Sequence, residues 1–274
     1  MTNPRLATLL VVLTVVLAGC FGGGVTDSGD DDAPDSDDST GTTTDSASAG
    51  TAAGTGDLSL SEAETNLQNG RSFTTEWSYN LTTVEGITST FSDRYQVDLT
   101  TNRSLEQYTA ATGSQVRTDY QRFVADGVRY TRYSSDGQAY YTSTDEVPSV
   151  FDSATGRASS FYTYLEEDAQ FVGQERFDGE TVSRYEYTDR EAWETYNQGV
   201  AAGTFGTDEN VTITDFAITT LVDGDGLARL TTWTLAGETE SGQAVSAEWR
   251  YSVTDIGSTD VDDPAWLDEA RTQT

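Results

Sequence analysis

The segment QRFVADGVRYTRYSSDGQAYYTST, residues 121–144, places two Asp-Gly pairs between short runs rich in aromatic and β-branched residues. Asp-Gly tolerates the positive φ angles that tight hairpin turns require, so each pair predicts an antiparallel connection between two strands. The same pair recurs along the chain at Asp126-Gly127, Asp136-Gly137, Asp178-Gly179, Asp223-Gly224 and Asp225-Gly226. These turns predict a meandering antiparallel sheet rather than parallel strands joined by helices.

Three further segments alternate apolar and polar residues with a period of two, which is typical of half-buried strands. They are RSFTTEWSYNLTT (71–83), FSDRYQVDLTT (91–101) and AVSAEWRYSVT (244–254). Each predicts one face that is core or cavity and one face that is wet. The apolar positions are Phe73, Thr75, Trp77, Tyr79, Leu81, Phe91, Tyr95, Val97, Leu99, Val245, Ala247, Trp249, Tyr251 and Val253.

Three helices are predicted beside the sheet. Ser61 and Glu64 have capping-box spacing and Gly70 is a stop signal, which predicts a helix over 62–69. Aromatic and aliphatic residues recur at helical spacing in SSFYTYLEED (159–168) and in TDREAWETYNQGVAAG (188–203). The fold class is therefore α+β, with the aromatic faces of the helices covering one face of the sheet.

The first twenty residues predict an export signal. Arg5 precedes an apolar run from Leu6 to Leu17 that is too short for a comfortable transmembrane helix, and small residues lead to Cys20. Leu17-Ala18-Gly19-Cys20 resembles the lipobox of prokaryotic lipoproteins, and this resemblance implies that Cys20 carries a lipid. The alternative is an ordinary signal peptide with an incidental cysteine.

Residues 21–57 consist almost entirely of Gly, Ser, Thr, Asp and Ala, which predicts a disordered acidic tether. Residues 58–274 are then expected to form a single domain. Three N-x-S/T sequons, which are possible N-glycosylation sites, begin at Asn80, Asn102 and Asn210.

The charge balance excludes nucleic acid as a partner. Asp and Glu number 46 against 15 basic residues, all of them arginine, so the net charge is −31. Binding to nucleic acid needs a basic footprint that this chain lacks. An acid excess without lysine resembles proteins of salt-loving archaea, in which high salt screens self-repulsion.

The residue inventory argues against an enzyme, and no cofactor is predicted. The chain has no histidine and one cysteine, which excludes Ser-His-Asp or Cys-His catalysis and His-ligated zinc. Hydrolysis by a carboxylate pair stays open, because carboxylates are plentiful. The acidic clusters at 223–226 and 260–264 are interpreted as a hairpin turn and a solvated end, so no metal site is predicted.

Two segments carry a family resemblance: FVGQERFDGETVSRYEY (171–187) and EWRYSVTDIGSTDVDDPAWL (248–267). With the order of the other elements over about 60–268, they resemble an uncharacterised family of haloarchaeal lipoproteins. The chain is more distantly similar to carriers of the LolA and LppX type. That similarity implies a strongly curved half-barrel sheet with helices on its concave side and a lipid-binding cavity between them.

The sequence thus predicts a lipid-anchored binding protein on the outer face of the cytoplasmic membrane, with its domain outside the cell. Its ligand would be a lipid or another apolar molecule. The candidate cavity-lining residues are Phe73, Trp77, Tyr79, Phe91, Tyr95, Trp249 and Tyr251. The alternative is a structural or sensory envelope lipoprotein in which the same rings are a filled core and the partner is a protein.

Overall fold

The computed structural model describes residues 60–135, 137–145, 147–156, 169–188, 205 and 207–273. The chain divides into two units, Met1–Gly56 and Asp57–Thr274, and all of the described residues belong to the second. Cys20 and the predicted tether lie outside them. The predicted signal peptide, lipid attachment and domain boundaries therefore stay predictions.

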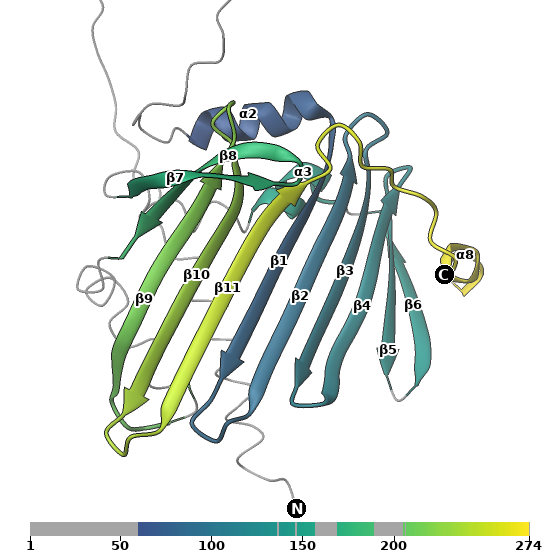
Figure 1. The fold of residues 1–274 in the computed structure, drawn as a ribbon. Coiled ribbons are helices and arrows are strands. Elements are labelled where there is room, and N and C mark those ends of the chain that lie inside the picture. The colour runs from purple at the N-terminus through teal and green to yellow at the C-terminus, as the bar shows by residue number, and fades with distance from the viewer. Residues whose placement is uncertain are drawn as a thin grey trace, which may run out of the picture. The chain divides into compact units, whose positions relative to one another are not determined.

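Eleven strands form one open antiparallel sheet in the order β6-β5-β4-β3-β2-β1-β11-β10-β9-β8-β7 (Figure 1). The strands are β1 (Ser72–Thr82), β2 (Thr88–Asp98), β3 (Arg103–Thr112), β4 (Gln115–Ala125), β5 (Val128–Ser135), β6 (Gln138–Thr144), β7 (Gln170–Phe177), β8 (Glu180–Tyr187), β9 (Val211–Val222), β10 (Ala228–Thr239) and β11 (Ala244–Thr254). The predicted antiparallel sheet is confirmed.

The Asp-Gly turns connect neighbouring strands as predicted. Asp126 and Gly127 have φ angles of 54° and 75°, and the turn pairs Ala125 of β4 with Val128 of β5. Two successive positive φ angles match the right-handed twist of the flanking strands, which is why this pair makes a two-residue hairpin. Asp178 and Gly179 repeat this geometry between β7 and β8.

The first and last strands lie side by side in the middle of the sheet. β1 pairs with β11 from Thr74 opposite Thr254 to Thr82 opposite Ser246. β2 to β6 continue the sheet outward from β1, and β10 to β7 continue it outward from β11. The two meanders are thus joined by a central pairing, which we call the β1–β11 seam.

Among the described residues, three helices accompany the sheet: α2 (Leu60–Gly70), α3 (Val150–Thr155) and α8 (Leu267–Gln273). α2 confirms the helix predicted over 62–69, whereas α3 and α8 were not predicted. The other two predicted helices fall almost wholly outside the described residues. No helix in the part of the chain that the structure describes has the length and apolarity to span a membrane.

α2 and α3 pack on the same side of the sheet. Leu67 of α2 and Phe151 of α3 join one buried cluster with Phe73, Val97 and other strand residues. The rings of Phe73 and Phe151 meet edge to face at 5.9 Å. Ser149 caps α3, because its hydroxyl accepts a hydrogen bond from the backbone N–H of Asp152.

α8 packs on the opposite side, where Trp266, Leu267 and Ala270 cover Phe123 of β4 and neighbouring residues. The sheet therefore has apolar contacts on both of its faces, at different places. The predicted half-barrel curvature and the concave position of the helices stay predictions.

Candidate functional site

The register of the strands puts aromatic rings on one face of the sheet, which we call the aromatic face. Tyr79 of β1 lies opposite Phe91 of β2 and opposite Trp249 of β11. Side chains alternate between the two faces along a strand, so this register gathers the rings of neighbouring strands on one side. The other side, which carries Glu76 and Arg250, is called the polar face.

A row of rings crosses eight neighbouring strands on the aromatic face, and we call it the aromatic ladder. Successive ring centroids are 4.7 to 6.5 Å apart, the separation at which aromatic pairs attract one another. In strand order from β4 to β8, the members are Tyr120, Tyr108, Phe91, Tyr79, Trp249, Trp233, Phe216 and Tyr187.

All seven residues predicted to line a cavity lie on the aromatic face. They divide into two environments. Phe73 and Tyr251, which are 0% and 3% exposed, belong to the cluster beneath α2 and α3. Tyr79 is also buried, and the half-buried members are Trp77, Phe91, Tyr95 and Trp249. Their role as the lining of a cavity stays a prediction.

The β3–β4 end of the ladder carries a buried charge. Glu106 is 4% exposed and accepts hydrogen bonds from the hydroxyl of Tyr120, at 2.8 Å, and from a guanidinium nitrogen of Arg122, at 3.2 Å. The Arg122 guanidinium lies 4.3 Å from the centroid of the Tyr120 ring, which is a cation–π distance. This end of the ladder therefore carries a buried ion pair, and Asp93 of β2, which is 1% exposed, lies on the same face.

Burial raises the pKa of the phenols of Tyr79, Tyr95 and Tyr120 well above the ordinary tyrosine value. The Glu106 carboxylate adds to the increase for Tyr95 and Tyr120, because a neighbouring negative charge disfavours the phenolate. These phenols are neutral hydrogen-bonding groups at physiological pH.

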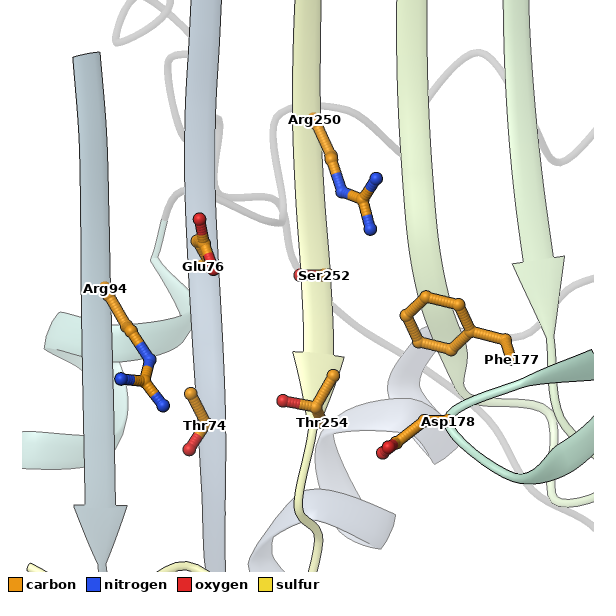
Figure 2. A pocket seen from close by; sticks show the side chains of 8 residues that line it. All are labelled: Thr74, Glu76, Arg94, Phe177, Asp178, Arg250, Ser252 and Thr254. Atoms are coloured by element: carbon orange, nitrogen blue, oxygen red, sulfur yellow. The ribbon is translucent and has the colours of Figure 1, made fainter.

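A cavity of about 420 Å³ lies on the polar face. Figure 2 shows side chains from β1, β2 and β11 on one side of it and the tip of the β7–β8 hairpin on the other. Its lining residues are Thr74, Glu76, Arg94, Phe177, Asp178, Arg250, Ser252 and Thr254. None of these residues was predicted as a site residue: those of β1, β2 and β11 are the polar partners in the alternation that predicted the aromatic face, and Phe177 and Asp178 belong to a hairpin that was predicted only as a turn.

Arg229 of β10 holds the tip of the β7–β8 hairpin against the sheet. Its side chain is 4% exposed, and its Nε donates to the carbonyl of Val253 at 3.0 Å. Its terminal nitrogens lie 2.6 Å from Glu180, 3.1 Å from Asp178 and 3.6 Å from Asp223. The wall of the polar-face cavity is therefore fixed by a buried arginine with three carboxylate partners.

Burial raises the pKa of the Asp223 carboxyl above its ordinary value. Two backbone N–H groups, of Leu227 and Asp225, donate to the same carboxylate at 2.9 and 3.0 Å and partly offset the increase. Arg229 offsets it further through its positive charge.

The three sequon asparagines are exposed, so each presents its side chain to solvent. Asn80 lies on the polar face of β1, Asn102 lies in the turn between β2 and β3, and Asn210 donates a hydrogen bond to Glu240. Glycosylation stays a prediction. Within the described ranges, no three acidic, histidine or cysteine side chains are placed to hold a metal ion.

A family model described as "Family of unknown function (DUF7537)" matches residues 5–270. No curated protein matches the sequence significantly. Among solved structures, LprF from Mycobacterium bovis is 11% identical, with 76% of this chain and 98% of that chain covered and a TM-score of 0.33. The LolA superfamily protein NE2245 from Nitrosomonas europaea is 12% identical, with 76% and 94% covered and a TM-score of 0.25.

Proposed function

The chain belongs to DUF7537, a family without an assigned function, and we propose that it is a lipid-anchored binding protein whose aromatic face holds a lipid or another apolar ligand. The protein would stand on the outer face of the cytoplasmic membrane. The aromatic ladder is the observation that supports this proposal.

Much of the ladder retains exposed aromatic surface. Tyr108, Phe91 and Trp233 are half-buried, as are Tyr120 and Trp249. The described helices α2 and α3 contact the cluster around Phe73, whereas the cluster around Tyr79, Phe216 and Leu235 contains no residue of a described helix. Covering exposed ring surface with an apolar ligand would contribute about 25 cal/mol per Å².

The ladder also suits an amphipathic ligand. Its aromatic rings can hold a hydrocarbon chain, and the Arg122, Glu106 and Tyr120 group at its β3–β4 end can hydrogen-bond a polar head. Binding sites of this kind combine an apolar lining with a few polar groups that fix orientation. We propose that the sheet curves as a half-barrel around this face.

The anchor would keep this face near its source of lipid. Two lipid chains on Cys20 would hold the protein stably, and the acidic tether of 21–57 would separate the domain from the membrane. A net charge of −31 disfavours direct contact with an anionic membrane, so a covalent anchor supplies the attachment that the surface does not. A Cys20→Ser chain should leave the membrane fraction, and unchanged retention would contradict the anchor.

The alternative function is that of a structural or sensory lipoprotein. The near-complete burial of Phe73 and Tyr251 favours it, because these rings already behave as filled core. In that case the aromatic face would bind no small molecule and a protein would be the partner.

The test is a lipid extraction and mass spectrometry of the full chain purified in detergent, followed by fluorescence quenching with a brominated fatty acid. Quenching should saturate and should weaken in Trp249→Phe, because Trp249 belongs to the aromatic ladder. Trp266→Phe is the matched control, since Trp266 packs with α8 on the opposite side of the sheet. The absence of both a co-purifying lipid and saturable quenching would refute the proposal.

A further inference from the structure

Two arginines that line the polar-face cavity form no ion pair with any residue that the structure describes. Neither Arg94 nor Arg250 forms an ion pair or hydrogen bond with another residue in the described part of the chain. Arg122, Arg184 and Arg229, by contrast, are engaged by carboxylates. Free guanidiniums that converge on one cavity are available to a ligand.

The register explains why these arginines converge. Arg94 of β2 lies directly opposite Glu76 of β1, while Arg250 of β11 lies opposite Ser78, two residues further along the same strand. All four side chains are on the polar face. Figure 2 shows Glu76 between the two guanidiniums.

The lining of the cavity carries two arginines and two acids, which is a balanced set in a strongly acidic chain. Asp178 also lines the cavity, but its carboxylate already accepts from Arg229 at 3.1 Å. Two guanidiniums therefore face one available carboxylate, that of Glu76. Such a site can bind an anionic group that pairs with the guanidiniums and keeps clear of Glu76.

The remaining lining residues are suited to a hydroxylated molecule rather than to a bare ion. Ser252 and Thr254 supply hydroxyls along β11, and Glu76 can accept hydrogen bonds from ligand hydroxyls. The half-buried ring of Phe177 forms an apolar wall opposite them. The volume of about 420 Å³ lies within the range of small-molecule sites, about 300–1,000 Å³.

We propose that the polar-face cavity binds a singly charged carboxylated sugar, such as a uronic acid, through Arg94 and Arg250. A guanidinium matches a carboxylate through two parallel hydrogen bonds, which a point charge does not provide. Glu76 and the β11 hydroxyls bind the sugar hydroxyls, and the Phe177 ring contacts the apolar face of the sugar ring. This site lies on the face opposite the aromatic ladder and does not depend on the function proposed for that face.

The test is calorimetric titration of the full chain in detergent with D-glucuronate, D-glucose and inorganic phosphate. D-glucuronate should bind saturably and at least tenfold more tightly than the other two probes. Arg94→Gln and Arg250→Gln should each weaken glucuronate binding at least tenfold. Arg117→Gln is the matched control: Arg117 is exposed on β4, lies outside the cavity and forms no ion pair with a described residue.

A second variant separates a binding effect from a folding defect. Glu76→Gln removes the carboxylate between the guanidiniums, so phosphate should bind at least fivefold more tightly than it does to the parent chain, a gain that misfolding cannot produce. Unchanged glucuronate binding in Arg94→Gln, an equal loss in Arg117→Gln, or tighter binding of phosphate than of glucuronate by the parent chain would each overturn the proposal.

Discussion

Replacing Arg229 by glutamine should test whether the tip of the β7–β8 hairpin is held by a buried charge. The guanidinium is 4% exposed and has three carboxylate partners, which differ in their own exposure. The side chains of Asp178 and Glu180 are 37% and 58% exposed, whereas that of Asp223 is 11% exposed. The substitution therefore leaves two carboxylates that can be rehydrated and one that cannot.

The expected loss follows from this difference. Asp178 and Glu180 form partly exposed pairs, each worth about 0–1 kcal/mol. Leaving a buried charge without its partner costs about 3–5 kcal/mol, and Asp223 belongs at the low end because two backbone N–H groups still bind it. The free energy of unfolding should fall by about 3–4 kcal/mol at pH 7, a large part of the roughly 5–15 kcal/mol typical of a domain.

The loss should also depend on pH. The pKa of Asp223 is already raised in the folded protein, and losing the positive charge of Arg229 raises it further. A carboxyl whose pKa is raised on folding binds its proton more tightly in the native state, so the penalty is full above the folded pKa and absent below the unfolded one. The difference between the variant and the parent chain should therefore shrink as the pH falls toward 4.

Urea denaturation followed by circular dichroism, at fixed salt and at several pH values, measures this difference. Arg184→Gln is the matched control, because its pairs with Glu175 and Glu186 are all more than one-third exposed and should contribute less than about 1 kcal/mol. If Arg229→Gln lowered the free energy of unfolding no more than this control does, or if that decrease did not change with pH, the conclusion that buried Arg229 holds the tip of the β7–β8 hairpin would be wrong.

Three further outcomes are expected from the packing. Phe73→Ala leaves a cavity at a fully buried position and should lower the free energy of unfolding, measured by urea denaturation, by about 3–5 kcal/mol. Val116→Ala, at a site 63% exposed, should change it by no more than about 0.5 kcal/mol. Equal losses in the two variants would contradict the assigned core. In a spectrophotometric titration the phenol of Tyr120 should ionise above the ordinary tyrosine pKa, because burial and Glu106 raise its pKa. Stability should fall as the pH rises above the unfolded tyrosine pKa, because the native state retains the proton longer. A titration in which Tyr120→Phe removes an early-ionising phenol would refute this. Gly237→Ala should lower the melting temperature, because an added Cβ would lie 2.9 Å from a backbone oxygen of β9. An unchanged melting temperature would contradict this, since it would mean that β9 moves aside with no loss of stability.

Turn chemistry and alternation predicted much of the sheet. Asp126-Gly127 and Asp178-Gly179 carry their own backbone preference, so their hairpins could be read locally. α3 was not predicted because its six residues are too few for a helical periodicity to be recognised in the sequence. The β1–β11 seam escaped because nothing local to Thr74 specifies Thr254 as its neighbour.

The two candidate sites also differ in how much of each could be predicted from the sequence. Alternation within single strands assigned the seven rings to one face before any pairing was known. The polar-face cavity depends on two pairings at once, since Arg94, Glu76 and Arg250 come from three neighbouring strands, β2, β1 and β11. It also depends on Arg229, which brings the β7–β8 tip across to β11. In the sequence, these residues are indistinguishable from an ordinary solvated strand face.

The β1–β11 seam has a consequence for how the domain folds. Every other pairing in this sheet joins strands that are consecutive in the chain, and apart from β8–β9, whose connection spans 188–210, these are hairpins that close short loops within microseconds. The seam closes almost the entire sheet-forming sequence into one loop, so it bears the largest entropic cost and offers the slowest step. Two preformed meanders would meet there last. A circular permutant opened between β6 and β7, with the end of α8 linked to the start of α2, would shorten the loop that the seam closes to these two helices and their connections, and it should fold faster.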